Sequence, residues 1–166
     1  QIVLSDLQSP ANPYLSEIAT IAIGGTGPGV DNTYAIGDVI EFDVTMKNAV
    51  TVSGAEVFTF KIGTADVTAS LDVAASTLTT GVPSVLKFKH TVVASDGVDT
   101  NGISYAANAI TGGSIKVAST NTDAKLLHVA ATDMSAYMVD GVAPTAPVLA
   151  LGAGVAGGAT SAEAIQ

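Results

Sequence analysis

Three stretches of this sequence alternate between apolar and polar residues, and this period of two constrains the fold more than any other feature. The clearest is VIEFDVTM (residues 39–46), and AEVFTFKIG (55–63) and VLKFKHTVV (85–93) repeat the pattern. Successive side chains of a β-strand point to opposite faces, so each stretch predicts a strand with one face in a core and the other towards solvent. Shorter β-branched runs predict further strands around residues 18–23, 67–73, 103–105, 115–117 and 137–139.

Helical spacing is nearly absent from the chain. The best candidate, ATDMSAYMV (131–139), is short, and clusters of Gly, Asn, Asp and Thr separate the strand-like runs. We therefore expect an all-β fold, with seven or eight antiparallel strands in two sheets and at most one or two helical turns.

The length of 166 residues suits one domain with additional segments at its ends. We expect residues 1–15 to be an N-terminal linker, residues 16–142 to form the β-sandwich, and residues 143–166 to be a linker and the truncated start of a following module. The chain opens with Gln1 and carries no basic segment followed by an apolar one, as a targeting signal would. We expect a mature product or a piece of a longer chain.

The charge balance excludes several classes of partner. Fifteen acidic residues stand against six basic ones, all of them Lys, which gives a net charge of −9. Such a chain repels nucleic acid and anionic membranes, and no apolar run approaches the ~20 residues of a membrane helix. The absence of Arg also argues against a phosphate site. We expect no nucleic acid partner and no membrane insertion.

The acidic residues instead favour calcium. Eleven of the fifteen are Asp, and the chain has no Cys for disulfides. The segment SDGVDTNGI places Asp96, Asp99 and Asn101 among two Gly residues, which suits the six to eight oxygen ligands that calcium takes at roughly 2.3–2.6 Å. The twelve-residue EF-hand spacing is missing. The alternative is a solvated turn, in which the same residue types tolerate left-handed dihedrals.

Other oxygen-bearing side chains stand in similar loops. Asp31 with Asn32 forms a second pair, near Asp38, which we interpret as an ordinary turn residue before a strand. Asn121 and Asp123 form a third pair. Glu17, at the first strand, and Asp140, before the chain leaves the domain, are candidates for calcium shared with neighbouring modules. Asp6 is a weaker candidate for the same role. The predicted metal ligands are Glu17, Asp31, Asn32, Asp96, Asp99, Asn101, Asp123 and Asp140.

Catalytic machinery is thin. His90 lies on the apolar face of its predicted strand and His128 follows two Leu residues, so we expect both to pack rather than act as bases. There is no nucleophile elbow, and two His without Cys are too few for zinc. Paired carboxylates can serve a glycosidase, but no cleft among aromatic residues is indicated. We expect no enzyme activity.

Four pieces of the sequence resemble the immunoglobulin-like modules of large bacterial repeat adhesins (RTX-type) exported by type I secretion. They are YAIGDVIEFDVTM, AVTVSG, LKFKHTVVASDGVDTNGISYAANAI and YMVDGVAPTAP, within about residues 17–147. The resemblance implies an immunoglobulin-like β-sandwich stabilised by calcium, an extracellular location on a bacterial surface, and neighbouring modules of the same adhesin. Two loops, LDVAASTLTTGVPS and ASTNTDAKLL, depart from the family pattern.

Altered loops on a retained scaffold are a usual place for binding function. We therefore expect an adhesion module that binds a peptide or protein ligand on another cell surface, through an extended peptide or its carboxylate, or a glycan. The rivals are a structural spacer whose loops calcium rigidifies and an extracellular hydrolase module.

Overall fold

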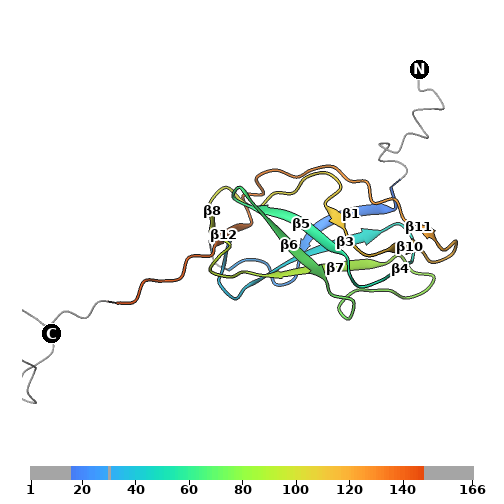
Figure 1. Ribbon diagram of the computed structural model, residues 1–166, viewed down its shortest axis with the longest axis horizontal. Coiled ribbons are helices and arrows are strands. Elements are labelled where there is room, and N and C mark those ends of the chain that lie inside the picture. Colours follow the sequence, from blue (N-terminus) through green and yellow to red (C-terminus); the bar gives the residue numbers. More distant parts are fainter. Residues whose placement is uncertain (1–15, 30, 148–166) are drawn as a thin grey trace, which may run out of the picture.

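The computed structural model describes residues 16–29 and 31–147, and the regular elements of this part of the chain are all strands (Figure 1). They run in the order β1 (Ile18–Gly24), β2 (Thr33–Ala35), β3 (Val39–Met46), β4 (Val50–Val52), β5 (Val57–Ile62), β6 (Ala65–Leu71), β7 (Val85–Thr91), β8 (Val98–Asp99), β9 (Ile110–Thr111), β10 (Ile115–Val117), β11 (Thr122–Asp123) and β12 (Met138–Asp140). The predicted all-β class is confirmed.

The main sheet has six strands in the order β1-β3-β7-β6-β5-β9, and all of its pairings are antiparallel. This sheet curls over on itself. Phe42 of β3 and Phe58 of β5 stack with ring centroids 4.4 Å apart, although β7 and β6 separate their strands in the sheet order. The two halves of the sheet thus face each other as the layers of a sandwich do.

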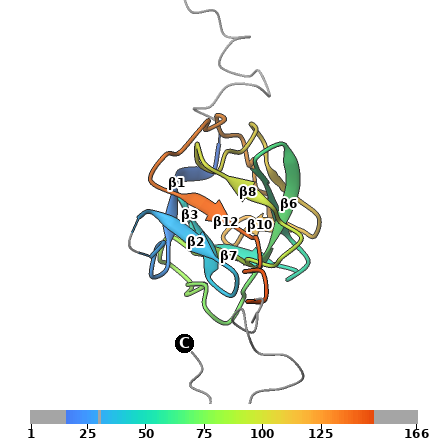
Figure 2. The same cartoon turned by 90° about the vertical axis from the view of Figure 1, so that its left-hand side faces the viewer.

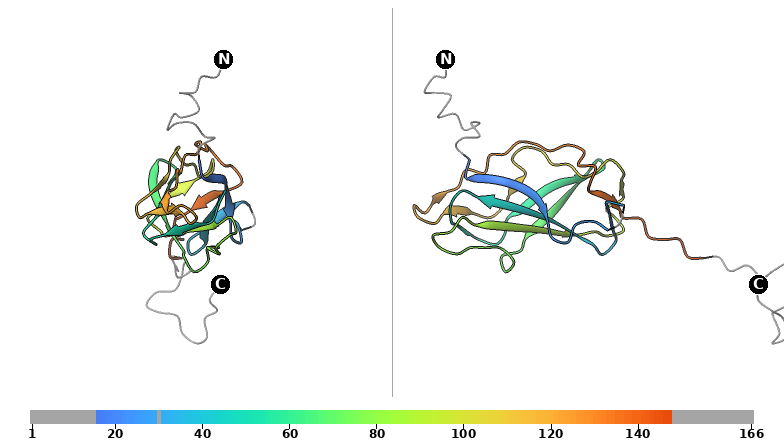
Figure 3. Two further views of the ribbon diagram at one scale, coloured as in Figure 1. Left: turned by 90° about the vertical axis from the view of Figure 1, so that its right-hand side faces the viewer. Right: turned by 180° about the vertical axis from the view of Figure 1, so that it is seen from behind.

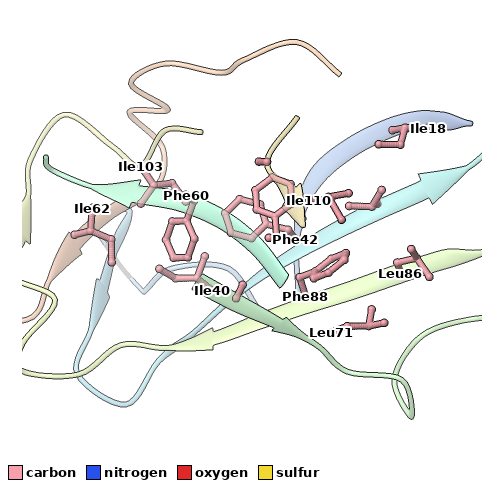
Figure 4. Close-up of a cluster of buried hydrophobic side chains, with 14 of the residues drawn as sticks. Ile18, Ile40, Phe42, Phe60, Ile62, Leu71, Leu86, Phe88, Ile103 and Ile110 are labelled. Carbon is pink, nitrogen blue, oxygen red and sulfur yellow. The ribbon is translucent and has the colours of Figure 1, made fainter. Parts of the chain in front are cut away.

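The core fills the space between these halves (Figure 4). The alternation in the sequence accounts for it, because the buried positions of β3, β5 and β7, with the exception of Glu41, are the apolar ones of the three alternating stretches. The largest fully buried apolar side chains are Tyr34, Ile40, Phe42, Met46, Phe58, Phe60, Leu86, Phe88 and Ile103.

The outer face of β3 and β7 carries a charge ladder. The Lys87 Nζ lies 2.6 Å from a Glu41 oxygen and 2.9 Å from Asp43, while Lys89 lies 2.9 Å from Asp72. Glu41 is only 5% exposed, and this burial raises its pKa. The hydrogen bond and positive charge of Lys87, together with side-chain hydrogen bonds to Asp43 and Lys89, outweigh burial and hold the pKa of Glu41 below its ordinary 4.5. Two Lys residues therefore neutralise acids in the middle of the molecule.

A short sheet closes each end of the sandwich. The order β11-β10-β4 forms one and β2-β12-β8 the other, in which β12 pairs with β2 in parallel. The described residues thus form twelve strands in three sheets rather than seven or eight in two. The strand predicted at residues 103–105 is absent: Ser104 and Tyr105 each make one isolated bridge. Just before them Gly102, at φ +102°, lies tightly against the backbone of Met134.

Candidate functional site

Six of the eight predicted metal ligands gather at one end of the sandwich, around the sheet β2-β12-β8, which we call the C-terminal end (Figure 2). The sheet positions them: the Asn32 carbonyl accepts a hydrogen bond from the Met138 amide at 2.8 Å, Asp99 lies opposite Val139, and Asp140 lies opposite Val98. The remaining three, Asp31, Asp96 and Asn101, lie in the adjoining loops. Residues distant in sequence are therefore brought together here.

The other two predicted ligands lie at the opposite, N-terminal end, with the sheet β11-β10-β4 (Figure 1). Glu17 accepts a hydrogen bond from the Asn48 side chain at 2.8 Å, and an Asp123 oxygen lies 4.0 Å from the Lys116 Nζ. Asn121 lies beside them in a left-handed turn, with φ at 55°. The eight predicted residues therefore do not form one site.

Asp99 is the most enclosed carboxylate of the C-terminal end, at 3% exposure. One oxygen accepts the Gly63 amide at 2.8 Å, and the other accepts the amides of Gly102 at 2.8 Å and Asn101 at 3.2 Å. These N–H donors come from the β5–β6 turn and from the loop after β8. Asp99 thus joins two turns through hydrogen bonds to its charge, which are stronger than neutral ones.

Asp96 is held by a histidine. One of its oxygens lies 2.8 Å from His90 Nε2 and also accepts the Val93 amide at 2.8 Å. The His90 ring packs edge-on against Phe60, with centroids 5.7 Å apart, while its Nδ1 lies 3.2 Å from the Thr68 carbonyl. The predicted packing of His90 on the apolar side is confirmed, and the pair fixes the loop after β7.

The more exposed residues of this end each organise a local turn. Asp38 accepts the Ala35 amide at 2.8 Å, which matches the predicted turn, and Asp140 accepts the Val142 amide at 3.0 Å. Asn101 donates to an Asp133 oxygen at 2.8 Å. Asn32 has a φ of 55°, a left-handed conformation that Asn tolerates better than most residues.

The acidic side chains of this end lie apart from one another. Within residues 16–29 and 31–147, no three His, Asp or Glu side chains lie close enough together to hold a metal ion. The oxygens of Asp99 already accept three N–H donors, and the Asp96 oxygen that binds His90 also accepts an amide. Calcium at this end stays a prediction.

One buried polar atom at this end has no protein partner among the described residues. The Tyr34 hydroxyl of β2 is fully enclosed and forms no hydrogen bond there. Burial raises the pKa of Tyr34 to about 12, and the charges of Tyr137 and Asp38 add to the effect. An unsatisfied buried hydroxyl usually costs about 1–3 kcal/mol.

Apolar side chains are also exposed at the C-terminal end. Five of the eight exposed large apolar residues of the described chain lie here: Ile36, Val39, Val93, Val98 and Val142. Val98 and Val142 also line a hollow of about 300 Å³ beside β8 and β12. This end therefore combines acidic and apolar surface where the chain leaves the sandwich.

The sequence interpretation missed a buried carboxylate at the N-terminal end. Glu56, 1% exposed, accepts hydrogen bonds from the Ser53 amide and hydroxyl, the Gly54 amide and the Ser114 amide, at 2.8–2.9 Å. Burial raises the pKa of Glu56. The hydrogen bonds from Ser53, together with further backbone hydrogen bonds such as that of Ser114, outweigh the effect of burial and lower the pKa below 4.5. The sequence did indicate this burial: Glu56 lies two positions before Phe58 in the alternating stretch, so both side chains point to the core face.

His128 is a packing residue. Its Nε2 accepts the Ala109 amide at 2.8 Å, while Nδ1 lies 2.9 Å from the Val129 carbonyl. The ring stacks on Phe58 and meets Tyr105 edge-on. Both ring nitrogens are thus engaged by the backbone, as expected for a structural histidine.

Comparison with known proteins identifies no relative: no family model, no curated protein and no solved structure matches the chain. In the described part of the chain, no helix has the length and apolar character needed to cross a membrane.

Proposed function

We propose that this chain is a non-catalytic, calcium-dependent adhesion module of a large secreted bacterial adhesin, with an immunoglobulin-like β-sandwich that binds an extended peptide. The observation that carries the proposal is the position of the chain ends. The described chain begins beside β11 and leaves beside β12, at opposite ends of the long axis (Figure 3). Modules threaded in this way join end to end into a long projection.

The support for calcium is the charge of the C-terminal end. Six Asp residues lie there, at positions 31, 38, 96, 99, 133 and 140, while Lys61 nearby is paired with Asp66 at 2.6 Å. Like charges crowded together destabilise a fold, and a divalent cation relieves that repulsion. Asp31, Asn32 and Asp140 are among the exposed residues of this end, where their oxygens can reach such an ion.

The test of calcium is thermal unfolding in millimolar calcium and in excess chelator. A ligand that binds only the folded state adds RT ln(1 + [L]/Kd), about 2.7 kcal/mol at a hundredfold excess over Kd. The midpoint should rise in calcium. Magnesium at the same concentration serves as the control for general ionic screening, and equal midpoints in calcium and chelator would remove calcium from the proposal.

The test of adhesion is a peptide array probed with the folded chain. We expect binding to extended peptides on the array. The same end-to-end threading also favours a second function, a spacer that holds a distant binding tip away from the cell. If the chain folds and responds to calcium but binds no peptide on the array, the spacer function replaces the adhesive one.

A further inference from the structure

A groove runs along the outer edge of β1, away from the acidic C-terminal end. It has a volume of about 370 Å³. One wall is β1 with the residues before it, and the other is the segment 127–129, with Tyr105 between them and Lys47 at one end. The residues that line this β1 groove are Ser16, Ile18, Ala19, Thr20, Ile21, Lys47, Tyr105, Leu127, His128 and Val129.

The two walls are joined at one end only. The Lys125 carbonyl accepts the Glu17 amide at 2.8 Å and the Ser16 hydroxyl at 3.2 Å. Beyond this point β1 continues along β3, whereas the second wall runs to Ala131, which pairs with Tyr105 instead. The groove is the space between the diverging segments.

Both walls present backbone groups that lack backbone partners among the described residues. β1 is an edge strand, paired only with β3, so every second residue directs its N–H and C=O groups outward. A register shift between Ile18 and Thr20 leaves Ala19 outside the ladder with β3. Across the groove, residues 126–130 form no backbone–backbone hydrogen bond within the described chain.

Apolar side chains of both walls line the groove beside a few polar ones and one charge. Ile21 and Leu127 are half-buried, and Val129 is 75% exposed. Lys47 is the single charged residue that lines the groove, in a chain of net charge −9. The groove therefore combines an apolar surface, unpaired backbone and a local positive charge.

We propose that the β1 groove binds an extended peptide as an added β-strand, with an acidic residue of the peptide beside Lys47. This inference rests on the proposed peptide-binding function and gives it a site. Strand addition satisfies the unpaired backbone groups on both walls, which a glycan or a small carboxylate does not. Antiparallel addition, the commoner arrangement, places the C-terminal residues of the peptide near Lys47, since Lys47 donates its amide to Glu17, just before β1.

The first experiment uses isotope-labelled full-length chain and an amidated peptide of alternating Val and Thr with one Glu near its C-terminus. We expect chemical-shift changes and slowed amide exchange in residues 18–24 and 126–130 of the calcium-loaded chain. The same peptide with alternate backbone N-methyl groups should not bind, because it cannot form the ladder. A peptide with the Glu moved to its N-terminus should bind more weakly.

Paired variants locate the site. Val129→Asp should weaken binding about tenfold or more by placing a charge among the apolar side chains of the groove, while Val142→Asp, at another exposed Val at the other end, should not. Lys47→Glu should weaken binding about fivefold, and Lys116→Glu, the same charge change outside the groove, should leave it unchanged. Thermal unfolding checks that all four variants fold.

Four outcomes would overturn strand addition in the β1 groove. Shifts confined to residues 31–38, 96–102 and 140 would move the ligand to the C-terminal end and keep the proposed peptide binding. Equal binding by the N-methylated peptide would exclude strand addition. Binding that emerges only after deletion of residues 1–15 would assign the groove to the chain's own N-terminal segment. Absence of binding by array and probe alike removes the adhesive function together with its site.

Discussion

The two ends of the sandwich are closed by similar means. At each end a three-stranded sheet meets a buried carboxylate that gathers N–H donors from two distant turns: Asp99 at the C-terminal end and Glu56 at the N-terminal end. Neither carboxylate has an ion-pair partner within 4.0 Å among the described residues. The backbone itself therefore stabilises a buried negative charge at both ends.

The two ends differ in the sequence context of their buried carboxylates. Asp99 stands among Asp, Asn and Gly, a context typical of calcium loops, whereas Glu56 stands inside a strand-like stretch. Yet Glu56 accepts four hydrogen bonds from protein groups and Asp99 accepts three. Sequence context thus indicated a metal ligand at one of two carboxylates that serve the same structural purpose.

Replacement of Glu56 should have the largest effect. Glu56→Ala removes the acceptor of the Ser53 and Gly54 amides and of the Ser53 hydroxyl, and leaves the Ser114 amide with the Ser53 hydroxyl oxygen alone. We expect a loss of about 3–4 kcal/mol in the free energy of unfolding. Urea denaturation measures it. Glu56→Gln keeps one acceptor oxygen and should lose about half as much. A loss below about 1 kcal/mol for Glu56→Ala would break the likeness between the ends.

Asp99→Ala should cost about 2 kcal/mol, less than Glu56→Ala because fewer hydrogen bonds are lost. The loss should be equal in calcium and in chelator if the three amides account for the role of Asp99. Urea unfolding of the variant and the parent chain under both conditions makes the comparison. A loss seen only in calcium would instead make Asp99 a calcium ligand, as its sequence context predicted.

Acid should act on the N-terminal end through Glu56. Its pKa in the folded chain is below the ordinary 4.5, so its ionised form stabilises the fold above pH 4.5. This contribution is lost as the pH falls from 4.5 through the lower folded pKa. Melting midpoints should therefore drop more steeply below pH 4.5 in the parent chain than in Glu56→Gln. Glu41, whose pKa is also lowered, titrates in both proteins, so the difference isolates Glu56.

The smallest effect should come from the C-terminal end. Tyr34→Phe removes a buried hydroxyl that has no partner among the described residues, and we expect stability to rise by up to about 1 kcal/mol. Thermal unfolding at neutral pH measures the change, with Tyr105→Phe as the matched control. A clear loss on Tyr34→Phe would show that the hydroxyl has a partner in solution.

Much of the main sheet follows from the sequence alone. The bounds predicted for VIEFDVTM are those of β3, because alternation places Ile40, Phe42 and Val44 on one face without reference to any other segment. The predicted strands of AEVFTFKIG and VLKFKHTVV likewise contain β5 and β7. Period-two patterning is a local property, and it survives in the folded chain wherever one face is buried.

Tertiary structure alone decided what the loops do. The sheet β2-β12-β8 brings Asp31, Asp99 and Asp140 to one end while Glu17 and Asp123 lie at the other, and no local pattern encodes which loops will meet. The same holds for Glu56, whose donor Ser114 is 58 positions away, and for the β1 groove, whose walls are separated by more than a hundred residues. Alternation fixes the faces of a strand, but the partners of a turn depend on how the sheet curls.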